Sequence, residues 1–96
     1  MLPNEKLDAI KNYLRKEFDN FDDVFERFDQ DRCAHIIAFT PADKKQRVRL
    51  TIPRKFVDDT SALQIANYLN NYQLSQDLTK NKKIVLQDSG IELESI

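Results

Sequence analysis

The residues whose types could do chemistry together are Cys33 and His35, which lie two positions apart in an apolar run. Alternate residues of a β-strand share a face, so a thiolate and an imidazole at this spacing could act as nucleophile and base. The chain holds one cysteine and one histidine, and no third group that would orient the imidazole is recognisable. We therefore favour a buried, chemically quiet Cys33 beside a packed His35, and we predict no catalytic residues.

The sequence also gives no basis for a metal or a cofactor. A closed zinc site takes four ligands, so Cys33 and His35 could complete one only across a symmetric dimer. The chain contains a single glycine, which is too few for a glycine-rich phosphate loop or a dinucleotide-binding motif. We therefore expect no cofactor, no metal ion and no enzymatic activity.

Acidic residues are concentrated in one segment of the chain. Six of them occur within thirteen positions: Asp19, Asp22, Asp23, Glu26, Asp29 and Asp31. Phenylalanines stand between them, and the segment has neither the regular spacing nor the glycine of a calcium-binding loop. We interpret these six residues as a solvated acidic face that could receive a partner.

Basic residues follow in a second block, which is offset only by Asp43: Lys44, Lys45, Arg47, Arg49, Arg54 and Lys55. Arg47 and Arg49 alternate with Val48, Leu50 and Ile52, which predicts a strand with one charged and one apolar face. If the acids and the bases occupy opposite outer strands of a meander, the molecule is dipolar. The alternative is that the arginines only solvate the sheet and protect an edge strand from aggregation.

Two helices are predicted to support these segments. Apolar residues recur every three or four positions from Leu7 to Phe18, so residues 3–18 should form an amphipathic helix. The Ser-x-x-Gln sequence at 61–64 has capping-box spacing and precedes an apolar stripe, which predicts a helix over residues 62–72. Leu74 and Leu78 could extend that helix by a short turn.

Three strands are predicted to form an antiparallel meander between the helices, over residues 23–29, 33–39 and 47–52. A rival to the first strand is one long helix over residues 3–28, since Phe21, Phe25 and Phe28 continue the helical spacing. We favour the strand because Asp19 and Asn20 are typical of a helix end, although the adjacent Val24 and Phe25 break strict alternation. Near the end of the chain, Gly90 suits the turn of a small hairpin with arms at 84–86 and 91–93.

The predicted fold is a small α+β domain that spans residues 1–96, in which the helices pack on one face of the sheet. Residues 54–57 should form a turn that places Phe56 on the core. The apolar faces of the predicted elements define one core: Leu7, Ile10, Leu14, Ile37, Phe39, Val48, Leu50, Ile52, Phe56, Ile65 and Leu69.

Composition limits the classes of function. Hydrophobic residues make up 41% of the chain and charged residues 32%, which is typical of a globular, water-soluble domain. A net charge of -1 gives no global attraction to nucleic acid or to an anionic membrane. The sequence lacks a leader-like start and a run approaching the roughly 20 apolar residues of a membrane span, so we expect a cytoplasmic protein.

We expect a non-catalytic accessory or protein-interaction domain, whose charged surfaces attract another protein or a second copy of the chain. The alternative is a nucleic-acid-binding module that uses the basic strand and loops at residues 44–55. Against the alternative, the positions that alternate with the apolar face of this strand offer arginine and threonine rather than aromatic rings on which bases could stack.

Overall fold

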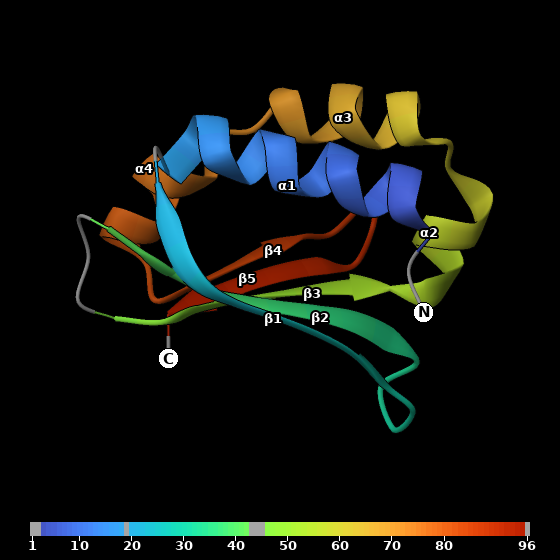
Figure 1. The fold of residues 1–96 in the computed structure, drawn as a ribbon, viewed down its shortest axis with the longest axis horizontal. Helices are drawn as coiled ribbons and strands as arrows, with labels where there is room; N and C mark the ends of the chain where they lie inside the picture. Colours follow the sequence, from blue (N-terminus) through green and yellow to red (C-terminus); the bar gives the residue numbers. More distant parts are fainter. Residues whose placement is uncertain (1–2, 19, 43–45, 96) are drawn as a thin grey trace.

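The computed structural model describes residues 3–18, 20–42 and 46–95, which form one antiparallel sheet with helices on one of its faces (Figure 1). The elements follow the order α1 (Asn4–Phe18), β1 (Phe21–Asp29), β2 (Ala34–Pro41), β3 (Val48–Pro53), α2 (Arg54–Asp59), α3 (Ala62–Asn70), α4 (Leu74–Lys80), β4 (Lys83–Leu86) and β5 (Ile91–Ser95). The strands lie in the order β1-β2-β3-β5-β4. In Figure 1, α1 and α3 lie side by side over the sheet.

The predicted fold class is confirmed: the chain forms a helix, an antiparallel meander, helices and a C-terminal hairpin in a small α+β domain. The rival helix over residues 3–28 is excluded, because α1 ends at Phe18 and β1 begins at Phe21. Gly90 has φ 76° in the turn between β4 and β5, and a Cβ there would lie 3.1 Å from Pro53 Cγ. Both the backbone conformation and the space at this turn therefore favour glycine.

Three helices, α2, α3 and α4, follow β3, where the sequence predicted a turn and a single helix. Residues 54–59 form the short helix α2 rather than a turn, and its Val57 is fully buried while Phe56 is only partly buried against Tyr68. The predicted capping box of α3 is present: Ser61 Oγ accepts from Gln64 N, and Gln64 Oε1 accepts from Ser61 N. Helix α3 ends at Asn70, before the position the sequence predicted.

Leu74 and Leu78 belong to a separate helix, α4, whose first turn is capped by a residue of α1. The side chain that precedes α4 makes no capping hydrogen bond. Instead, Glu17 Oε1 accepts hydrogen bonds from Ser75 N at 3.0 Å and from Ser75 Oγ at 2.9 Å. A carboxylate at the first turn of a helix satisfies a backbone donor and interacts favourably with the helix dipole. Burial of Leu74 and Leu78 holds α4 against the core.

The core lies between the helix layer and the sheet. Nine of the eleven predicted core residues are buried there, and Leu7 and Phe56 are partly buried against the same cluster. The hairpin adds Leu86, Ile91 and Leu93 to this cluster. No helix of the described residues is long and apolar enough to cross a membrane.

The sheet face that points away from this core, called the open face below, has a buried centre of its own. Ala34, Ile36 and Ala38 of β2 alternate with the core residues Ile37 and Phe39, and each is at most 7% exposed. They lie outside the main hydrophobic cluster. No helix packs on the open face within the described residues.

Candidate interaction site

The outer edge of β1 is the longer of the two outer strand edges in the described part of the sheet. This strand is nine residues long and ends the strand order, so one of its edges has no neighbour among the described strands. It carries two exposed large hydrophobic side chains, Val24 at 41% and Phe25 at 50% exposure. The opposite end of the sheet is β4, which has four residues. A long free edge with exposed apolar side chains is a template for pairing with another chain.

The two halves of β1 differ in regularity. Pairing with β2 shifts register between Asp22 and Phe25, and Asp23 has φ 56°, a left-handed conformation that is uncommon outside glycine. From Phe25 to Asp29 the pairing with β2 is continuous. The adjacent Val24 and Phe25 that break the sequence alternation thus mark a β-bulge, and the regular edge begins after it.

The acidic residues predicted as one face take different positions around β1. Asp22 and Asp23 are exposed at the bulge, and Glu26 is half-buried at a position paired with Ile37, on the helix-covered side. Asp29 closes the β1–β2 turn, because its Oδ1 accepts from the backbone N of Asp31 at 3.0 Å. Asp31 is exposed in that turn, and Asp19 lies outside the described residues.

Arg47 connects the basic block to the bulge. Its Nη2 donates to the backbone oxygen of Asp23 at 2.8 Å, and its Nη1 donates to Thr40 Oγ1 at 3.2 Å. The guanidinium therefore spans from the start of β3 across β2 to β1. This side chain has a structural role at the bulge and is only partly available to a partner.

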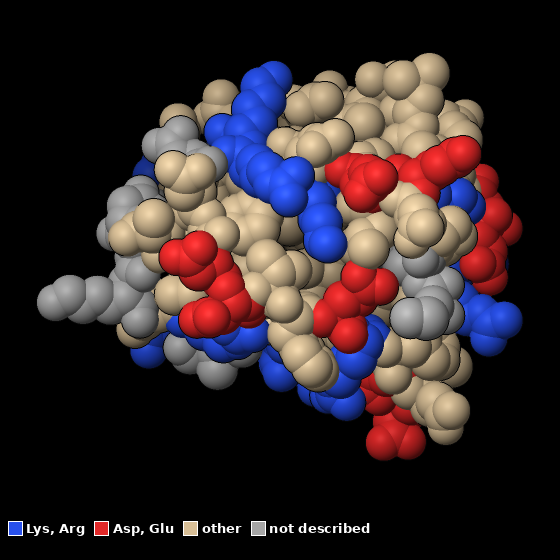
Figure 2. All heavy atoms as spheres, viewed as in Figure 1, with Lys and Arg blue, Asp and Glu red and all other residues tan. Residues whose placement is uncertain are grey.

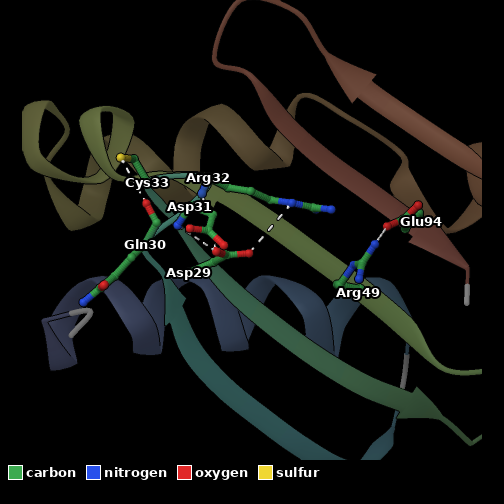
Figure 3. A network of polar contacts seen from close by, with 7 residues as sticks. All are labelled: Asp29, Gln30, Asp31, Arg32, Cys33, Arg49 and Glu94. Atoms are coloured by element: carbon green, nitrogen blue, oxygen red, sulfur yellow. Dashed lines mark hydrogen bonds and ion pairs between the residues drawn. The ribbon is translucent and has the colours of Figure 1, made fainter.

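Arg49 lies on the open face and is paired with Glu94 of β5, the residue opposite it in the β3–β5 ladder (Figure 3). The Nε of Arg49 is buried without a hydrogen-bond partner among the described residues. Lys83 and Glu92 form a second ion pair on this face at 3.5 Å. Both pairs line a groove of about 560 Å³, to which Arg32 and Thr51 also contribute.

The structure does not bring the four described members of the predicted basic block together. Arg54 belongs to α2, where it pairs with Asp58 at 3.4 Å and lies 6.0 Å from the ring centroid of Phe28. Arg47 and Arg54 are separated by the whole of β3, about 23 Å at the rise of a strand. Lys55 is exposed on α2, and Lys44 and Lys45 lie outside the described residues.

The expected dipole across the sheet rested on β3 being an outer strand, and this was wrong. Strand β5 pairs with β3 on the side away from β2, so Arg49 is in the interior of the sheet and has Glu94 beside it. The sequence carried no local signal for the pairing between β3 and β5, which joins residues far apart in the chain.

The predicted environment of Cys33 was also wrong. Cys33 is exposed in the turn that precedes β2, has φ 49°, and its Sγ lies 3.6 Å from the backbone oxygen of Gln30 (Figure 3). It therefore does not share a strand face with His35. Strand β2 begins one residue later because the left-handed backbone at Cys33 completes the β1–β2 turn.

His35 is packed, as the sequence predicted. It is 5% exposed, and its ring centroid lies 5.1 Å from that of Phe28. Burial lowers the pKa of His35 below its ordinary value of 6.5, which the charges of Asp58 and Glu26 partly oppose. Within the described residues no group of three or more histidine, cysteine, aspartate or glutamate side chains could hold a metal ion.

No protein-family model, curated protein or solved structure matches this chain.

Proposed function

We propose that the protein is a non-catalytic protein-interaction module, and that its partner is an extended, basic segment of another protein that pairs with the outer edge of β1. The observation that carries the proposal is the free edge of this nine-residue strand, on which Val24 and Phe25 are exposed. Strand addition supplies main-chain hydrogen bonds along such an edge, and side-chain contacts select the partner.

The charge of β1 defines the chemistry of the partner. The strand has four acidic residues, Asp22, Asp23, Glu26 and Asp29, against the single base Arg27. Pairing of this strand with its own copy would bring two acidic strands together, whereas a strand that carries lysine or arginine complements it. The partner strand should pair with the regular stretch from Phe25 to Asp29, because the bulge interrupts regular strand geometry before Phe25.

Nucleic-acid binding is the alternative suggested by the basic block of the sequence. It is less favoured than protein binding, because three arginines of that block already have partners. Arg49 is paired with Glu94, Arg54 with Asp58, and Arg47 donates to Asp23 and Thr40. A phosphate would have to displace these partners. The acidic residues of β1, which Arg47 reaches at Asp23, would also repel it.

The proposal is tested with a synthetic peptide of alternating valine and lysine or arginine, titrated into the isotopically labelled protein. The expected result is a set of amide chemical-shift changes concentrated on residues 25–29, with slowed hydrogen exchange there and binding that weakens as salt is added. Shift changes confined to the open face or to the helices would contradict edge pairing.

A matched pair of variants isolates the edge. Phe25→Lys and Val85→Lys each place a cation at a half-exposed hydrophobic position, the first on β1 and the second on β4, the strand at the other end of the sheet. Phe25→Lys should weaken peptide binding by about tenfold or more, while Val85→Lys should not. Tight oligonucleotide binding by the wild type at about 0.15 M salt, where the screening length is about 8 Å, would instead favour the nucleic-acid alternative.

A further inference from the structure

A second surface lies on the helix layer, between the two longest helices, α1 and α3. A groove of about 510 Å³ separates α1 from α3 and is lined by small side chains, Ala9, Ala62 and Ala66. Leu63 also lines it and is 71% exposed, more than any other large hydrophobic side chain of the described residues. Small residues let another helix approach closely, and an exposed leucine beside them gives that helix an apolar contact.

Charged residues divide this groove, called the α1/α3 groove below, into two halves. Glu5 and Asp8 line it near the start of α1, and Lys16 lines it near the end. Asp8 and Lys16 are about 12 Å apart along the helix axis. All three are exposed, and they take part in none of the ion pairs between described residues. In Figure 2, basic side chains gather over the C-terminal part of α1, and acidic ones lie toward its N-terminal part.

We propose that the α1/α3 groove is the interface of a symmetric homodimer, in which α1 of one copy lies antiparallel to α1 of the other. A two-fold axis at the level of Asn12 places Asp8 of each copy beside Lys16 of its partner. The same ion pair therefore forms twice across the interface. This self-complementarity is the requirement of an isologous interface. It distinguishes a second copy from an unrelated helix, which would need its own matching charges.

The directions of the helices favour the same arrangement. α1 and α3 run in the same direction over the sheet, so their N-terminal ends lie together (Figure 1). In the antiparallel dimer these ends, which carry partial positive charge, face the C-terminal ends of the partner's helices. Leu63 of each copy then packs into the other copy's groove, and the four helices form a central layer between two outer sheets.

The test exchanges one charge at a time and follows the molecular mass by sedimentation equilibrium. Asp8→Lys and Lys16→Asp both alter exposed side chains, so circular dichroism should show an intact fold. Each variant alone places like charges together twice and should raise the dissociation constant of the dimer by about tenfold or more. An equimolar mixture of the two variants restores both attractive pairs and should recover the dimer as a heterodimer.

Lys55→Asp provides the control, because it makes the same charge change as Lys16→Asp at an exposed position of α2 that does not line the groove. It should dimerise like the wild type. A wild type that stays monomeric at millimolar concentration would overturn the proposal, as would single variants that dimerise normally. If the single variants are monomeric and the mixture remains so, the antiparallel arrangement is wrong.

Discussion

Arg47 donates a hydrogen bond through Nη2 to the backbone oxygen of Asp23, a residue with left-handed backbone geometry in the edge strand, over a distance of 2.8 Å. The same guanidinium donates to Thr40 Oγ1 on the strand between them. A bulge leaves backbone groups without a ladder partner. Arg47 supplies a donor to the carbonyl of the exposed Asp23 from the far side of β2, and so ties the bulge of β1 to the start of β3.

Removing this side chain should loosen the bulge. Arg47→Ala is expected to lower the free energy of unfolding by about 0.5–1.5 kcal/mol, because the donor to the exposed Asp23 carbonyl is lost. Urea denaturation measures the loss, and hydrogen exchange should accelerate at residues 22–25 before it does elsewhere. Lys55→Ala, at an exposed position of α2, should change neither. Equal destabilisation by both substitutions would contradict a specific role for Arg47.

The cap that α1 provides to α4 is a second long-range polar contact with a measurable value. Glu17→Ala should cost about 1 kcal/mol of unfolding free energy, since the backbone N–H of Ser75 loses its acceptor. Glu17→Gln keeps an oxygen at the same position and should cost less. The same measurement on both variants separates the hydrogen bond from the charge, and an alanine variant as stable as the wild type would exclude the cap.

Local patterns in the sequence predict most of this fold. The spacing from Leu7 to Phe18 and the capping box at Ser61 and Gln64 are contained in single elements, and both are present. The β3–β5 pairing and the cap on Ser75 depend on residues that are distant in the chain, so no local pattern marks them. The prediction that acidic and basic residues occupy opposite outer strands failed for the same reason, because the strand order decides which charges become neighbours.

Cys33 shows how one residue at an element boundary changes a chemical prediction. As the first residue of a strand it would be buried and slow to react, but it is exposed in the turn before β2. We expect a thiol reagent to label the native protein at nearly the rate found in denaturant. Cys33→Ser should abolish labelling with little change in unfolding free energy. Slow labelling that speeds up only on denaturation would show that the thiol is protected.

The buried imidazole makes stability depend on pH. Because burial lowers the pKa of His35 in the native state, the unfolded chain takes up a proton first as pH falls through 6.5. The contribution of neutral His35 is therefore complete above 6.5 and is lost as pH falls toward the native pKa. Thermal melts between about pH 7.5 and 5 should show a falling midpoint. His35→Gln, which does not titrate, should flatten this decline, and an unchanged slope would contradict the assignment.

The position of β5 beside β3 has a consequence for how fast the protein can fold. Strands β1, β2 and β3 pair with their neighbours in the chain, as do β4 and β5, so each of these ladders closes a short loop. The ladder that pairs Leu50 with Leu93 must instead enclose all three helices between β3 and β4. Closing that loop costs entropy before its contacts form. This topology favours a folding order in which the β1–β2–β3 meander and the β4–β5 hairpin form first and dock late. The hydrogen bonds between β3 and β5 should then be the last to gain protection from hydrogen exchange.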